Sequence, residues 1–278
     1  GEQALVGSGL GELGQNEIDR LATGRKLGFD FAIDDAVFTL TAQTRSEDVN
    51  DQLYLFAAKL GMPRWDKEPV LRAKAGAELA YNTYATSPGG VLNRDLEFLV
   101  TGGDKRFATP DPAALKAATP EEFRKVWEPL LKQGPIEVLV FGEFDKAKVT
   151  EQLRLTFGAL APRDAIPADV AARVPGFAPA ADQPTVVTHR GDANQAAAVV
   201  AWRSGGGTEE LRTSRQLEIL TQLFNNRLMD ALRERAGASY APQVFSRWPA
   251  DLETGGRITA VAQLTPETVP LFFAEADK

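Results

Sequence analysis

Alternation of apolar and polar residues predicts half-buried strands in both halves of the chain. In residues 36–43, Phe38, Leu40 and Ala42 fall on one face of an extended segment, and polar residues fall on the other. The continuous apolar run 136–141 is short enough to predict a buried strand. Later segments carry the same kind of signal, and we expect further strands at 185–189, 196–202, 239–246 and 256–263.

Helical periodicity and start signals separate these strands. Ser46 is expected to cap a helix whose apolar stripe contains Val49, Leu53, Phe56 and Leu60. Thr119, followed by proline and then by Glu122, has the pattern of a capping box. Other helices are expected from Glu68 to about Tyr84, through Val149, Leu153 and Phe157, and from about Glu209 to Arg235, the last with a stripe of Leu217, Leu220, Phe224, Leu228 and Leu232.

A proline-rich stretch and an internal repeat suggest how the chain is organised. Residues 161–184 contain many prolines and alanines without clean periodicity, so we expect domains at 1–163 and 184–278 joined by a linker at 164–183. Residues 38–53 align with 258–273, with five identities at an offset of 220. The first copy would then lack its opening strands and the second its tail, as in a piece of a longer protein. The predicted fold class is α+β: two truncated tandem repeats of an antiparallel sheet with helices packed on one face.

Composition narrows the chemistry of this protein. Lysine and arginine number 31 against 38 acidic residues, a net charge of −7 that argues against a nucleic-acid partner. No apolar run reaches the roughly 18–20 residues of a membrane-spanning segment. The chain has no cysteine and one histidine, His189, which excludes a self-contained zinc site with two or more histidines. We expect His189 to form local hydrogen bonds, and the glycine clusters to be turns, because none has a phosphate-loop pattern.

The segment 227–242 carries the strongest candidate site. Arg233 lies near the end of the long predicted helix, and Tyr240 begins the next predicted strand seven residues later. Two interpretations stay open for this pair. A basic residue at a helix C-terminus can complement the helix dipole while the tyrosine packs. Alternatively, guanidinium and phenol can donate together to one carbonyl or oxyanion.

Three segments resemble the insulinase-like M16 zinc metallopeptidases. The run LRERAGASY at 232–240 is similar to the LRE-x-x-G-x-x-Y signature in the C-terminal half of these enzymes. The stretch 134–163 resembles the G-D-F-D segment that ends each domain of the family, and 107–131 resembles the helices before it. The resemblance implies tandem α+β domains whose two halves enclose a peptide substrate.

The resemblance also implies which half this is. Zinc in the family is held by an H-x-x-E-H motif in the N-terminal half, and this chain has no such motif. The chain is therefore similar to the C-terminal, non-zinc-binding half, and no metal ligand is carried over. Arg233 and Tyr240 match the pair that binds the substrate carbonyl and stabilises the tetrahedral intermediate. The sequence departs from the family pattern only next to this tyrosine, which is flanked by Ser239 and Ala241.

These implications lead to one functional hypothesis and two rivals. The leading hypothesis is the C-terminal half of a zinc metalloendopeptidase, with the zinc-binding N-terminal half in the same chain or in a partner subunit. This segment alone is expected to bind no zinc and to be inactive. The rivals are a catalytically inactive M16-like scaffold or partner subunit, and a standalone peptide-binding module. The resemblance and the Ala/Arg-rich composition favour a bacterial periplasm or cell envelope.

Overall fold

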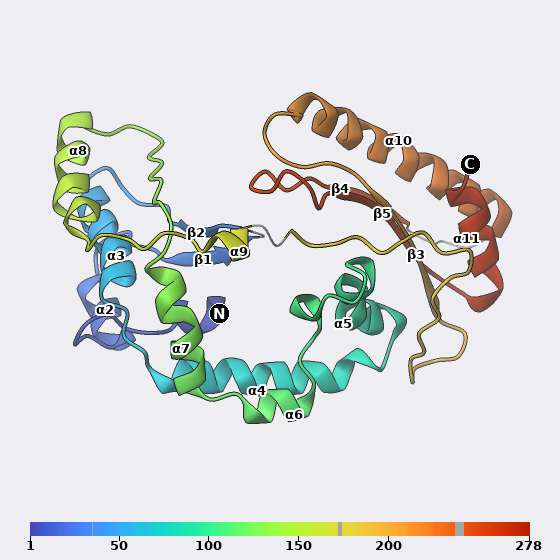
Figure 1. The fold of residues 1–278 in the computed structure, drawn as a ribbon, viewed down its shortest axis with the longest axis horizontal. Coiled ribbons are helices and arrows are strands. Elements are labelled where there is room, and N and C mark those ends of the chain that lie inside the picture. The colour runs from blue at the N-terminus through green and yellow to red at the C-terminus, as the bar shows by residue number, and fades with distance from the viewer. Residues whose placement is uncertain (35, 172–173, 237–241) are drawn as a thin grey trace. The chain divides into compact units, whose positions relative to one another are not determined.

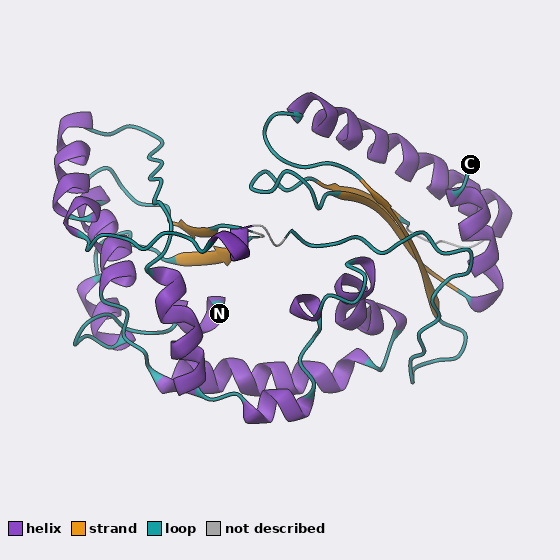
Figure 2. Cartoon of the chain, in the orientation of Figure 1, coloured by secondary structure: helices purple, strands orange, loops and turns teal. Residues whose placement is uncertain are grey.

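The computed structural model describes residues 1–34, 36–171, 174–236 and 242–278. Contacts between residues divide the chain into two units, each made of two segments. The first unit is Gly1–Ala77 with Ala113–Ala172, and the second is Glu78–Pro112 with Arg173–Lys278. Figure 1 labels the elements, and Figure 2 shows helices and two small sheets. The domains 1–163 and 184–278 and their linker stay a prediction.

The first unit has a two-stranded antiparallel sheet. Strand β1 (Asp30–Ile33) pairs with β2 (Phe38–Thr41), and Phe31 lies opposite Leu40. Phe31 is buried with Leu5 and Leu131, and its ring contacts Trp127 edge to face. The helical elements of this unit are α1 (Glu2–Val6), α2 (Gln15–Leu21), α3 (Val49–Gly61), α4 (Lys67–Tyr84, which continues into the second unit), α6 (Pro112–Ala117), α7 (Pro120–Leu131), α8 (Lys146–Leu155), η2 (Phe157–Ala159) and α9 (Ala168–Ala171).

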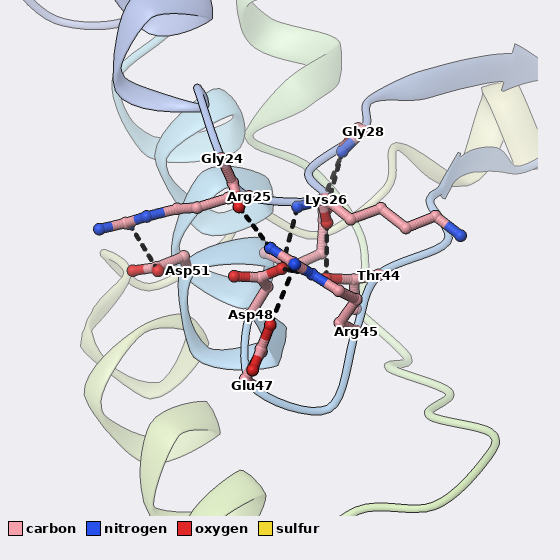
Figure 3. A network of polar contacts seen from close by, with 10 residues as sticks. Gly24, Arg25, Lys26, Gly28, Thr44, Arg45, Glu47, Asp48 and Asp51 are labelled. Atoms are coloured by element: carbon pink, nitrogen blue, oxygen red, sulfur yellow. Dashed lines mark hydrogen bonds and ion pairs between the residues drawn. The ribbon is translucent and has the colours of Figure 1, made fainter.

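A polar network ties the segment before β1 to the start of α3. The Asp48 carboxylate accepts hydrogen bonds from the Lys26 backbone nitrogen at 2.9 Å and from Arg45 Nε at 2.6 Å. Figure 3 shows the Arg45 guanidinium between Asp48 and the Gly24 carbonyl, which accepts a second bond at 2.6 Å. The Lys26 hydrogen bond and the Arg45 guanidinium lower the pKa of Asp48. The carboxylate therefore anchors this segment in its ionised form.

The start of α3 differs from the prediction. The helix begins at Val49 with Asp48 at the N-cap position, so Ser46 is not the cap. The Ser46 hydroxyl instead donates to the Glu143 carbonyl at 2.8 Å, which removes it from the helix terminus. The capping box at α7 is confirmed, because the Thr119 hydroxyl accepts from the Glu122 nitrogen and the Glu122 carboxylate accepts from the Thr119 nitrogen.

The second unit has a three-stranded antiparallel sheet in the order β3-β5-β4. The strands are β3 (Ala196–Arg203), β5 (Arg257–Leu264) and β4 (Gln243–Arg247). Helices α10 (Leu211–Ala236) and α11 (Val269–Ala276) lie along one face and bury a shared core with Leu232, Ala260 and Phe272 (Figure 1). The opposite face meets α5 (Pro88–Val100). The unit also contains η1 (Lys105–Phe107) and η3 (Pro266–Thr268).

These sheets and helices confirm the α+β class, and the repeat is visible in the elements. Val49 is the first residue of α3, and Val269, 220 positions later, is the first residue of α11. Each helix follows a strand of an antiparallel sheet, β2 in one unit and β5 in the other. The sequence match of 38–53 to 258–273 thus corresponds to two strand–helix junctions.

Several local predictions were wrong. Residues 136–141 and 185–189 form no strand in the described part of the chain. Phe141 is 86% exposed, so the apolar run there is not a buried strand. Strand β4 begins at Gln243, and residues 239–241 of its predicted range lie outside the described residues. Helix α8 ends at Leu155, and Phe157 begins the separate turn η2.

Candidate functional site

Of the predicted pair, the structure describes Arg233, which lies near the C-terminal end of α10. Leu228 and Leu232 are buried against the sheet and fix the helix, which leaves the neighbouring Arg233 exposed. Tyr240 lies outside the described residues, so the Arg233/Tyr240 pairing stays a prediction. Arg233 is available for a ligand on the surface of the second unit.

Arg233 shares one side of α10 with two amide residues. Gln222, Asn226 and Arg233 are separated by four and seven residues, spacings that return to the same side of a helix with 3.6 residues per turn. All three side chains are exposed. Asn226 and Arg233 are about 10 Å apart along the helix axis, from the rise of about 1.5 Å per residue. A guanidinium and amide groups thus follow one another along an open helix face.

An open groove lies between this helix and the edge strand β4. It has a volume of about 460 Å³ and is lined by Gln222, Asn225, Asn226, Pro242, Gln243, Val244 and Phe245. Asn225 Oδ1 accepts a hydrogen bond from the Val244 backbone nitrogen at 3.1 Å, which joins helix and strand at the groove. Primary amides carry both donors and acceptors, the same groups as a peptide backbone. The groove can therefore hydrogen-bond an extended chain without regard to its side chains.

The amide residues of the groove were not predicted from the sequence. Gln222, Asn225 and Asn226 have the spacing i, i+3, i+4, which places them on neighbouring positions of one helix surface. That spacing was a usable signal. The contribution of Gln243 to the groove could not be predicted from the sequence, because it depends on β4 lying beside α10.

His189 has the local role that we expected. Its Nδ1 accepts from the Gly191 backbone nitrogen at 3.1 Å, and its Nε2 lies 2.8 Å from the Gln195 carbonyl oxygen. Both ring nitrogens are therefore engaged within the loop 189–195. Among the described residues, no three His, Cys, Asp or Glu side chains gather in a group that could hold a metal. The described residues do not fit a zinc site.

The first unit has a second, smaller cavity around a buried lysine. The cavity has a volume of about 20 Å³ and is lined mainly by apolar side chains, with Lys59 among them. Burial lowers the pKa of Lys59 to about 8, and Asp66 and Asp19 oppose this shift. The Lys59 Nζ donates to the carbonyls of Ser8 and Val6 at the end of α1. This lysine is held by the backbone and serves as a structural contact.

The fold and the site define an α+β domain protein with an amide-lined groove and without a metal-ligand group among its described residues. A family model described as the peptidase M16 inactive domain matches residues 117–277, and the chain belongs to this family. Among the described residues, no helix has the length and apolarity needed to cross a membrane.

Several solved structures have the same fold as this chain. The periplasmic protease PqqL from Escherichia coli is 15% identical with a TM-score of 0.73, over 99% of this chain and 30% of PqqL. A protease from Helicobacter pylori is 17% identical with a TM-score of 0.67, over 98% of this chain and 67% of that one. A peptidase M16 inactive domain from Pseudomonas fluorescens is 16% identical with a TM-score of 0.62, over the same shares of the two chains. The comparison with curated proteins gave no match.

Proposed function

We propose that this chain is the C-terminal, non-zinc-binding half of an M16 metalloendopeptidase. In this role it forms part of the wall around a peptide substrate and supplies Arg233 and Tyr240 to the reaction. The observation that carries the proposal is the amide-lined groove beside β4, on the same helix side as the exposed Arg233. The chain spans about 30% of the length of PqqL, which leaves room in such a protein for a zinc-binding half.

The chemistry of the pair suits peptide hydrolysis. The amides of Gln222 and Asn226 would hold the backbone of the substrate, and Arg233 would meet it further along the helix. A guanidinium and a phenol both donate hydrogen bonds, and donors directed at a developing oxyanion stabilise the transition state. The zinc and its ligands would come from the other half, because the described residues do not fit a metal site. PqqL is a periplasmic protease, and we propose the bacterial periplasm for this chain also.

The test is a peptidase assay on the full-length protein or on the assembled halves, loaded with zinc. With a quenched fluorescent peptide, Arg233→Ala and Tyr240→Phe are each expected to lower kcat on the order of 10²–10³-fold, as loss of one oxyanion donor does. Arg227→Ala is the matched control, since Arg227 is an exposed arginine on another side of the same helix. An unchanged kcat for Arg233→Ala would exclude the donor role.

The rival role is an inactive scaffold or partner subunit that binds peptide or supports assembly. The match to the inactive domain of the family favours this role as far as zinc chemistry is concerned. The two roles are distinguished by whether the zinc-binding motif H-x-x-E-H is encoded upstream in the parent gene or in a neighbouring gene. Without H-x-x-E-H in either place, the peptidase role is wrong and the scaffold role remains. With the motif present, the peptidase assay above decides.

A further inference from the structure

Three arginines stand in a row across the sheet of the second unit. Arg257 on the central strand β5 is paired with Arg203 on β3 and with Arg247 on β4. Alternate residues of a strand point to opposite faces, and Ala260 and Leu264 face the core under α10. The three arginines therefore lie on the other face, the one that meets α5.

Such a row is unfavourable without a counter-ion. Directly paired residues of an antiparallel sheet have Cβ atoms about 4.5–5.5 Å apart, and like charges in these positions destabilise the sheet. Glu97, near the C-terminal end of α5, is a counter-ion of the central arginine, because its carboxylate accepts a hydrogen bond from Arg257. Arg247 has interactions with other groups, so the charge balance is considered for Arg203 and Arg257 alone. Arg203 is exposed and forms no ion pair with any described residue, so Arg203 and Arg257 together carry one more positive charge than Glu97 balances.

Arg257 has unused hydrogen-bonding capacity. Its residue is 6% exposed, and its Nε has no hydrogen-bond partner among the described residues. The neighbouring Thr259 on the same face is 1% exposed, and its hydroxyl is likewise without a partner in the described part of the chain. Buried polar groups normally have partners, and an arginine accommodates a second carboxylate through its fork of donors.

We propose that Arg203 and Arg257 form a binding site for the carboxylates of an acidic peptide segment. The incoming carboxylate would bind beside Glu97, which is 45% exposed, or take its place on Arg257. The inference extends the proposed function, because it names an acidic segment in the peptide that this half would hold. It does not depend on the zinc-binding half, on Arg233 or on Tyr240, and it can be tested on this chain alone.

The test is fluorescence anisotropy with a labelled, C-terminally amidated, glutamate-rich peptide and with a glutamine-rich peptide of equal length. The glutamate peptide is expected to bind more tightly, although the chain itself has a net charge of −7. Arg203→Gln is expected to weaken its binding on the order of tenfold, the scale of one charge-assisted contact. Glu97→Gln is expected to strengthen binding, since it removes the competing carboxylate. A purely structural ion pair would give no such gain.

The matched control is Arg212→Gln on α10, which removes the same charge from an exposed residue of a helix on the other face of the sheet. Equal losses for Arg203→Gln and Arg212→Gln would overturn the proposal, as would equal binding of the two peptides. A glutamine-rich peptide with a free C-terminus separates a terminal carboxylate from acidic side chains. If only that peptide gains affinity, the acidic-segment proposal is wrong. If Arg233→Ala lowers peptidase activity but leaves binding of the glutamate-rich peptide unchanged, each of the two proposals is supported independently of the other.

Discussion

Lys59 is a buried charge in the first unit whose cost to the fold can be measured. The residue is 7% exposed, and its ammonium donates to the carbonyls of Ser8 and Val6 and lies 4.9 Å from the Phe29 ring centre. These contacts hold the charge, yet burial still lowers its pKa to about 8 from 10.5. The unfolded chain therefore keeps a proton on this side chain at pH values where the folded chain has released it.

This difference predicts a pH dependence of stability. Between about pH 8 and 10.5 the unfolded state binds more protons at Lys59, so the contribution of this group to stability rises with pH. Below pH 8 both states are protonated and the full penalty is present. The free energy of unfolding of the wild type, minus that of Lys59→Met, is expected to rise by roughly 1–3 kcal/mol from pH 8 to pH 10. Urea unfolding at a series of pH values measures this difference.

Exposed Lys125 supplies the control for this series. The difference between the wild type and Lys125→Met should stay flat over the same pH range. If the Lys59→Met difference is equally flat, the ammonium is better solvated than its burial indicates, and the prediction is wrong.

Along α10, the buried stripe differs by one position from the predicted one. Leu220 is 50% exposed, whereas Thr221 is buried. The Thr221 hydroxyl donates to the Glu218 carbonyl at 2.8 Å, so its polar group is satisfied within the helix and its methyl group can face the core. Leu217, Thr221, Phe224, Leu228 and Leu232 form the inner face. A hydrophobicity pattern cannot distinguish a locally satisfied threonine from a solvated one.

Substitution at two leucines of α10 tests this assignment of faces. Leu228→Ala is expected to lower the free energy of unfolding by about 2–5 kcal/mol, because it opens a cavity in the core shared with Ala260 and Phe272. Leu220→Ala, the same change on the exposed side, is expected to stay within about 0.5 kcal/mol of the wild type. Denaturant unfolding followed by circular dichroism compares them. A larger loss for Leu220→Ala would mean that this face is covered in solution.

Elements with local signals were predictable from the sequence, and elements that depend on partners were less so. The capping box of α7 and the periodicity of α4 are patterns of residues close together in the chain. The start of α7 at Pro120 was predicted, and α4 was placed within one residue of its observed bounds. A strand is defined by pairing, and residues 136–141 have no paired strand in the described ranges. The same limit applies to the site. Arg233 is a candidate that follows from a motif in consecutive residues, whereas the groove depends on β4 packing beside α10.

At the scale of the whole chain, the proposed role as the non-zinc-binding half of a peptidase predicts that this chain alone binds no zinc and has no peptidase activity. The described residues include no group of metal ligands, and both nitrogens of His189 are engaged in a loop. The purified chain, dialysed against zinc, is expected to retain no more metal than the buffer blank and to leave a quenched peptide intact. Elemental analysis and the fluorescence assay measure the two outcomes. One equivalent of bound zinc would contradict the assignment to the non-zinc-binding half.

The ion pair between Glu97 and Arg257 has a consequence for biosynthesis. The two residues are 160 positions apart, and the chain leaves the second unit after Pro112 and returns to it at Arg173. On a ribosome that emits about 5–20 residues per second, α5 leaves the exit tunnel roughly 10–30 seconds before β5. During that interval the first unit can complete its fold, while the face of α5 that packs against the sheet has no partner until β5 has been synthesised. Contacts of such long range slow folding, so the second unit is the part of the nascent chain most exposed to chaperones and proteases.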